Sequence, residues 1–137
     1  MTRVHAYDAG FEPAAPVIPV RVARPHGGED GIALPMLVDT GADCTLIPIE
    51  VVRRLRLPVV DVVTVTALGG AKVVADVHAA AIDAGGGATV MRIVALANEA
   101  ILGRDALANL VVVLDGPARR LSVRGGPRRT KARPRKR

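Results

Sequence analysis

The sequence of this 137-residue chain predicts an all-β fold with one or two short helices. Half of the residues are hydrophobic but only Tyr7 and Phe11 are aromatic, so Val, Ile, Leu, Ala and Met must build the core. Their large β-branched share favours strands. Short β-rich runs alternate with Gly- and Pro-containing turns, and no strand-helix-strand repeat is present. The length predicts one domain and leaves no room for a duplicated, two-lobed one.

The predicted elements follow from these runs and turns. Residues 1–16 mix Pro, Gly and scattered apolar groups, and predict an irregular N-terminal arm. Pro48 begins a short helix that ends before Pro58, and residues 104–110 have helical character. The Gly69-Gly70 pair between two β-rich runs predicts a hairpin with a flexible tip, which we interpret as a movable flap. The predicted strands cover residues 17–24, 31–38, 59–68, 72–82, 88–96, 111–115 and 119–123.

The net charge of +6 comes from the end of the chain. Residues 124–137 hold eight Lys or Arg and no acid, which leaves eleven basic and thirteen acidic residues, a charge of −2, for the rest. The body is therefore not a basic nucleic-acid module. The tail, residues 124–137, has no large apolar residue to anchor it and is predicted to be disordered. It is either a solvated tail or makes a loose contact with RNA, DNA or another polyanion.

Neither a membrane nor a metal is expected from the residue pattern. No apolar run reaches the roughly 18 residues that span a bilayer, and the start of the sequence has no signal-like segment, so a cytoplasmic protein is predicted. The single cysteine, Cys44, is too isolated for a zinc site and has no partner for an internal disulfide. His5, His26 and His78 are widely separated and support neither a triad nor a metal cluster. No cofactor is predicted.

The most informative segment covers residues 37–43, Leu-Val-Asp-Thr-Gly-Ala-Asp. A buried strand delivers Asp39 rigidly to a turn, Thr40 can hold the loop by hydrogen bonds, and Gly41 permits close approach of another backbone or a ligand. Hydrolysis of a peptide by carboxylates alone needs one ionised and one protonated group. A second carboxylate is therefore required, and in a chain of this length another copy must supply it.

A second segment makes the first one specific. About sixty residues further on, residues 101–107 read Ile-Leu-Gly-Arg-Asp-Ala-Leu, an apolar pair followed by Gly, Arg-Asp and a short helix. With the Gly-containing hairpin between them, the two segments resemble those of the single-domain retropepsin-like aspartic proteases, which include the retroviral proteases. The resemblance covers residues 17–123. It implies the acid protease fold, a closed β-barrel with a flap hairpin, and a homodimer.

The resemblance also implies roles for individual residues. Asp39 is the catalytic aspartate of each protomer, and the two Asp39 carboxylates share a proton and activate a water, as is known for aspartic proteases. Thr40 interlocks with its counterpart across the dimer, and Gly41 contacts substrate through its carbonyl. The implied substrate-binding positions are Gly41, Ala42, Asp43, Gly69 and Gly70.

Arg104 and Asp105 are expected to give structural support. Arg104 lies in the second segment and can pair with Asp43, which would fix the loop that carries Asp39. Asp43 is then either a substrate contact or a support for the loop, and both roles stay open.

Two functions from different classes follow. The first is an aspartic endopeptidase that cleaves extended peptides or unfolded proteins. The alternative is a catalytically inactive retropepsin-like domain for dimerisation or peptide binding, with a nucleic-acid-binding tail.

Overall fold

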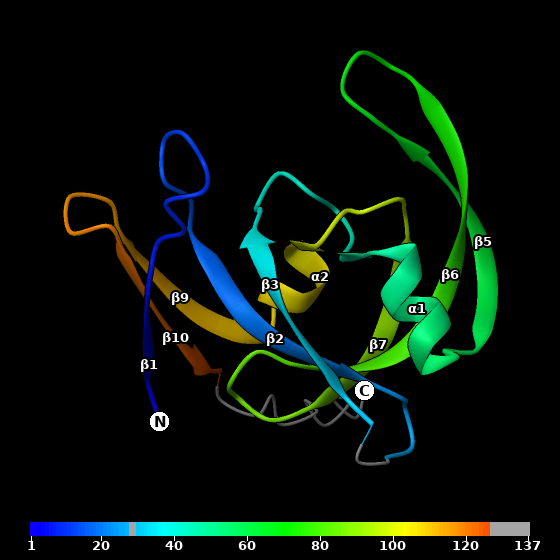
Figure 1. Cartoon of the computed structure of the whole chain (residues 1–137), viewed down its shortest axis with the longest axis horizontal. Coiled ribbons are helices and arrows are strands. Elements are labelled where there is room, and N and C mark those ends of the chain that lie inside the picture. The colour runs from blue at the N-terminus through cyan, green and yellow to red at the C-terminus, as the bar shows by residue number, and fades with distance from the viewer. Residues whose placement is uncertain (28–29, 127–137) are drawn as a thin grey trace, which may run out of the picture.

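The computed structural model describes residues 1–27 and 30–126, which form two sheets and two short helices (Figure 1). The bounds of the elements are β1 Arg3–Ala6, β2 Val17–Ala23, β3 Ile32–Val38, β4 Leu46–Ile47, α1 Ile49–Leu55, β5 Val59–Thr66, β6 Lys72–Asp83, β7 Thr89–Ala95, β8 Ile101–Leu102, α2 Arg104–Leu107, β9 Leu110–Asp115 and β10 Arg120–Gly125.

The larger sheet closes on itself. Its strands follow the order β2-β3-β8-β4-β7-β6-β5, and an additional pairing of β2 with β6 joins its two sides. In that pairing Arg21 lies opposite Asp83 and Ala23 lies opposite Ala81. The pairing leaves only β5 outside the ring. The predicted all-β closed barrel is confirmed.

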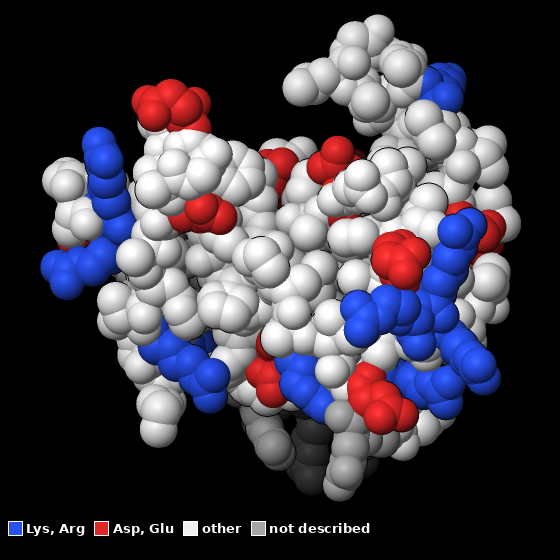
Figure 2. Space-filling model, viewed as in Figure 1, with Lys and Arg blue, Asp and Glu red and all other residues white. Residues whose placement is uncertain are grey.

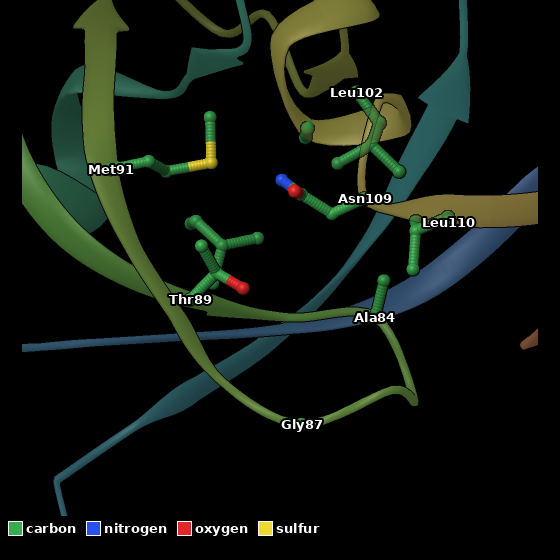
Figure 3. A pocket seen from close by; sticks show the side chains of 9 residues that line it. Ala84, Gly87, Thr89, Met91, Leu102, Asn109 and Leu110 are labelled. Carbon is green, nitrogen blue, oxygen red and sulfur yellow. The ribbon is translucent and has the colours of Figure 1, made fainter. Parts of the chain in front are cut away.

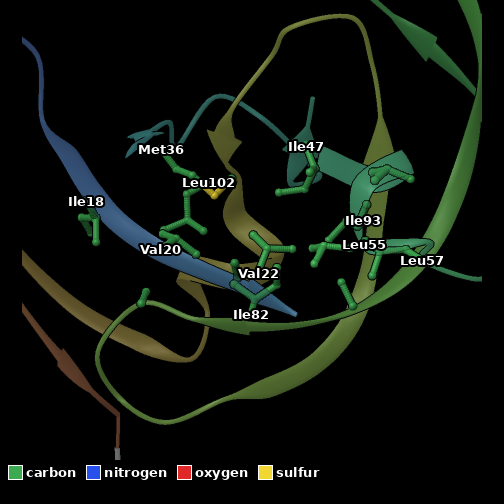
Figure 4. Packing of buried hydrophobic residues seen from close by; sticks show 14 of the residues in the cluster. Ile18, Val20, Val22, Met36, Ile47, Leu55, Leu57, Ile82, Ile93 and Leu102 are labelled. Carbon is green, nitrogen blue, oxygen red and sulfur yellow. The ribbon is translucent and has the colours of Figure 1, made fainter. Parts of the chain in front are cut away.

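The barrel interior is aliphatic, as the composition predicts. In β2, Ile18, Val20 and Val22 are fully buried, and the residues between them are exposed. This alternation is the period of a strand with one face toward a core. Figure 4 shows these side chains converging with Met36 and Leu102 from neighbouring strands. Dense packing of this kind holds the strands rigidly, and β3 and β8 end at the loops described below.

The helices partly match their predicted extents. Helix α1 follows Pro48, as predicted, and ends at Arg56, which adopts a left-handed conformation (φ 50°). Its Val52 and Leu55 side chains are buried against the core. Helix α2 is shorter than predicted because Leu110 already belongs to β9. Within the described residues neither helix has the length and apolar character needed to cross a membrane. The cytoplasmic location stays a prediction.

The prediction of an irregular arm over residues 1–16 is wrong for residues 3–6. These residues form β1, which pairs antiparallel with β10, so that β1, β10 and β9 make a separate three-stranded sheet. The pairing partner lies more than a hundred residues away, and a four-residue strand has too little periodicity to reveal it. Strand β10 also continues to Gly125, two residues past the predicted domain boundary at 123. The rest of the basic tail, from residue 127, lies outside the described residues.

The predicted hairpin of β5 and β6 is present and projects beyond the barrel (Figure 1). Thr66 pairs with Lys72 at its end, and Gly69 and Gly70 adopt positive φ values of 86° and 85° at the tip. Every residue of β5 is at least partly exposed to solvent. The base of the hairpin is anchored by the buried Ala75 and Val77, whereas residues 66–74 are all exposed, which is the property expected of a tip that opens and closes.

Candidate active site

Asp39 lies directly after β3, at the end of the barrel from which the flap projects. The parallel pairing of β3 with β8 fixes its backbone, because the Asp39 amide donates to the carbonyl of Leu102 at 3.1 Å. The Asp39 carboxylate accepts a hydrogen bond from the Gly41 amide through Oδ1 at 2.8 Å. A Cβ at Gly41 would lie 3.1 Å from that oxygen, so glycine leaves the carboxylate the space it needs. This hydrogen bond orients the carboxylate at the end of the strand.

Arg104 ties the loop of residues 39–45 to the start of α2. Its amide donates to the Ala42 carbonyl at 2.9 Å, and its Nη1 donates to the Thr40 carbonyl at 2.8 Å. Nη2 forms the predicted ion pair with Asp43. The two side chains are 55% and 88% exposed, so the ion pair adds little to stability. Its effect is on the position of the loop.

Thr45 forms the buried part of the same connection. Its side chain is fully buried, and Oγ1 donates to Asp105 Oδ1 at 2.7 Å while accepting from the Gly103 amide at 3.1 Å. The Thr45 amide donates to Asp105 Oδ2 at 3.2 Å. Asp105 also accepts from the Ala106 amide at 2.8 Å. Thr45 could not be predicted from the sequence, since its only signal is a lone hydroxyl before a two-residue apolar strand.

Gly103 is required by a close backbone contact. A Cβ placed there would lie 2.4 Å from the Cys44 carbonyl oxygen and 3.0 Å from the Thr45 nitrogen. Its φ of −83° is open to any residue, so the constraint is space and not backbone conformation. The two sequence segments that carry the resemblance therefore pack backbone against backbone.

A cleft of about 770 Å³ lies between the Asp39 loop and the flap. Asp39, Gly41, Ala42 and Asp43 line it, and its apolar walls come from Leu46, Val63, Val65, Val94, Leu96 and Ile101. This volume and lining suit an extended peptide with aliphatic side chains. From the flap, Ala67 and Leu68 line the cleft, and Gly69 and Gly70 lie next to them at the tip without lining it, so their substrate-binding role stays a prediction. Thr40 is exposed and does not line the cleft.

Cys44 lies in the cleft beside these carboxylates but is not an activated thiol. Burial raises the pKa of the Cys44 thiol, and the negative charges of Asp105 and Asp43 raise it further. The thiolate is the nucleophilic form, so this environment opposes cysteine catalysis. Among the described residues no three His, Cys, Asp or Glu side chains are grouped as metal ligands would be.

A second cavity lies beneath the turn between β6 and β7 (Figure 3). It measures about 20 Å³, room for about one water molecule. Ala84, Thr89, Met91, Leu102 and Asn109 contribute to its wall, which contains no charged side chain. This cavity is a packing gap and has no chemistry to offer a substrate.

A closed barrel with an aspartate directly after β3 is what the resemblance to the acid proteases predicts, and the comparison with known families agrees. The chain belongs to the aspartyl protease family, whose model matches residues 18–123. Among solved structures, EIAV protease complexed with the inhibitor HBY-793 is similar, with a TM-score of 0.55 and 23% sequence identity. The match covers 69% of this chain and 86% of that chain. It confirms the retropepsin-like fold. A search of curated proteins found no match.

Proposed function

We propose that this protein is an aspartic endopeptidase that works as a homodimer, with one Asp39 from each protomer at a shared site. The observation that supports the proposal is the Asp39 carboxylate at the cleft, which accepts a hydrogen bond from the Gly41 amide while the Asp39 amide donates to the Leu102 carbonyl. Asp43, the nearest other carboxylate in sequence, is engaged by Arg104. A second copy is the simplest source of the second catalytic group.

The proposed chemistry uses the two carboxylates as base and acid. The ionised carboxylate accepts a proton from a water, whose oxygen forms a bond to the scissile carbonyl carbon. The protonated carboxyl donates its proton to the carbonyl oxygen, which gives a neutral tetrahedral diol. The carboxyl that took up the water's proton then donates a proton to the amide nitrogen, while the other carboxylate accepts the proton of one diol hydroxyl. The carbon-nitrogen bond breaks, an acid and an amine leave, and the two carboxyl groups return to their starting protonation states. Because the proton is returned at each turnover, the site needs no metal or organic cofactor for this sequence of steps.

The flap and the loop have supporting roles in this proposal. Closure of the β5-β6 hairpin over a bound peptide would exclude bulk water and strengthen the interactions with the carboxylates. Gly41, Ala42 and Asp43 would contact the substrate backbone, since all three line the cleft. Thr40, whose side chain is exposed, would meet its counterpart in the second protomer.

The test compares wild type with Asp39→Asn in the cleavage of an unfolded protein and of a peptide library. Asp76→Asn is the matched control, because Asp76 is exposed on β6 and does not line the cleft. We expect Asp39→Asn to abolish cleavage and Asp76→Asn to retain it. Sedimentation equilibrium on the same samples records the oligomeric state, and the rate per chain should fall on dilution below the dimer dissociation constant.

Two outcomes would contradict the proposal. A strictly monomeric protein that still cleaves would rule out the shared site, and cleavage by Asp39→Asn at the wild-type rate would rule out the proposed catalytic residue. A wild-type dimer that cleaves nothing would favour the alternative, an inactive domain for dimerisation or peptide binding. Deletion of residues 127–137, which spares β10, then tests whether polyanion binding depends on the tail.

A further inference from the structure

The charges that line the cleft are all negative. Asp39, Asp43 and Glu99 contribute carboxylates to its wall, and no Lys or Arg lines it. Arg104 offsets the charge of Asp43, whereas Glu99 forms no ion pair with any residue in 1–27 or 30–126. Figure 2 shows acidic residues at the hollow beneath the projecting flap, while most Lys and Arg residues of this face lie at its sides and lower part. The cleft therefore presents an uncompensated negative charge.

Glu99 occupies a fixed and accessible position. It lies on the turn between β7 and β8, and its amide donates to the Leu96 carbonyl at 3.0 Å. The turn leads directly into Ile101, which pairs with Leu37 of β3 two residues before Asp39. Glu99 is exposed, so its carboxylate is accessible to a ligand in the cleft and the free protein does not bear the cost of a buried, unpaired charge there.

A second groove, of about 240 Å³, meets the cleft at this residue. Glu99 and Ile101 line both spaces, and the far wall of the groove includes Asp8 and Phe11 from the loop between β1 and β2. The Asp8 amide donates to the Ala15 carbonyl at 2.8 Å and closes this loop at its base. No basic residue lines the groove either. A peptide leaving the cleft on this side passes Glu99.

We propose that Glu99 is a specificity-determining residue that selects peptide substrates carrying a Lys or Arg side chain near the cleaved bond. The inference rests on the proposed function and names its substrate class. Apolar groups such as Ile101 accommodate the aliphatic stem of the basic side chain, and the Glu99 carboxylate binds its charged end. The same carboxylate repels acidic peptides, which adds to the discrimination.

The cleavage test uses peptides of one parent sequence in which a single Arg replaces Leu at each position in turn. Wild type should show kcat/KM about three- to tenfold higher for at least one Arg peptide than for the parent, the range expected for a partly exposed ion pair. Glu99→Gln should bring the ratio close to one, and Glu99→Lys should favour an acidic replacement instead. Glu50→Gln, an exposed acid on α1 away from both spaces, should keep the wild-type ratio. The preference should shrink as salt is added.

A binding measurement separates this inference from the proposed function. Fluorescence anisotropy of the labelled parent and Arg peptides is recorded with Asp39→Asn and with Asp39→Asn/Glu99→Gln. If wild type cleaves nothing, the proposed function fails, yet tighter binding of an Arg peptide that is lost in the double variant still supports the role of Glu99. Equal affinity for all peptides, no binding, or an Arg preference that survives Glu99→Gln overturns the inference, even where cleavage upholds the proposed function.

Discussion

Asp105 accepts two hydrogen bonds from Thr45, one from the hydroxyl and one from the backbone amide, across sixty residues of sequence. The same hydroxyl accepts from the Gly103 amide, so three polar groups of one buried cluster satisfy one another. Buried polar groups are costly unless paired, and this cluster leaves none of its side-chain atoms unsatisfied. The Asp39 loop and the start of α2 are therefore one structural unit.

Thr45→Val should lower the free energy of unfolding by about 2–3 kcal/mol. Valine keeps the shape of threonine but removes the donor to Asp105 and the acceptor for Gly103. Urea denaturation followed by circular dichroism, at one fixed chain concentration, measures the change. Thr89→Val, at an exposed position on β7, should stay within about 0.5 kcal/mol of wild type. If Thr45→Val lowers the free energy of unfolding by less than about 0.5 kcal/mol, the cluster is dispensable for stability.

Gly103→Ala should be destabilising by about 2–3 kcal/mol, because the new Cβ meets the Cys44 carbonyl and neither backbone can easily move. Gly116→Ala provides the matched control. A Cβ at Gly116 meets nothing within 4 Å, so the change should leave stability within about 1 kcal/mol, on the stabilising side. Thermal melts of the two variants side by side make the comparison. Equal stabilities would contradict the close contact between the two loops.

Arg104→Lys should reduce cleavage about tenfold while lowering unfolding free energy by less than about 1 kcal/mol. The two guanidinium nitrogens of Arg104 donate separately to the Thr40 carbonyl and to Asp43. The single ammonium group of lysine cannot reproduce that two-pronged geometry. Arg92→Lys is the control, because Arg92 is an exposed arginine that reaches Asp61 only at 3.5 Å. It should change neither quantity. A loss of stability without a loss of activity in Arg104→Lys would reverse the assigned role.

Alkylation of Cys44 should require a more alkaline pH than alkylation of a free thiol. Burial and the carboxylates of Asp105 and Asp43 disfavour the thiolate, so its pKa lies above the usual value. Asp43→Asn removes one negative charge, so the midpoint of the rate against pH should move toward neutral. Asp76→Asn should leave it in place. The chain has one cysteine, so iodoacetamide labelling followed by mass spectrometry reports this site alone. An unmoved midpoint in Asp43→Asn would contradict the electrostatic cause.

The sequence predicts the fold well where a local pattern exists. The β5-β6 hairpin has long β-branched arms and a Gly-Gly tip, and the strand before Asp39 has an uninterrupted apolar run. Both elements can therefore be predicted from the sequence. Strand β4 has only two residues and owes its place to pairing with β7 and β8, which no local pattern can show. The pairing of β1 with β10 depends on a partner at the other end of the chain.

The candidate site divides in the same way. Asp39 is marked by the order of the residues around it, and the Asp43-Arg104 ion pair is expected from the resemblance of the two segments to the retropepsin-like family. Thr45 and Glu99 could not be predicted. The Thr45 hydroxyl is bonded to a residue sixty positions away, and Glu99 lines the cleft only because distant segments meet there in the fold. Gly69 and Gly70 illustrate a different limit of the sequence. Their residue type predicts the turn correctly, but the reach of the hairpin decides which residues line the cleft.

The distance in sequence between Thr45 and Asp105 also governs the order of events during synthesis. The chain leaves the ribosome from its N-terminus, so Asp39 emerges long before the residues that fix its loop. Until Asp105 follows, the hydroxyl and the amide of Thr45 both lack their carboxylate acceptor, and the loop lacks its final hydrogen bonds. A nascent chain therefore carries Asp39 before its loop can adopt the final hydrogen-bonded conformation. That conformation forms only after residues 103–105 have been made.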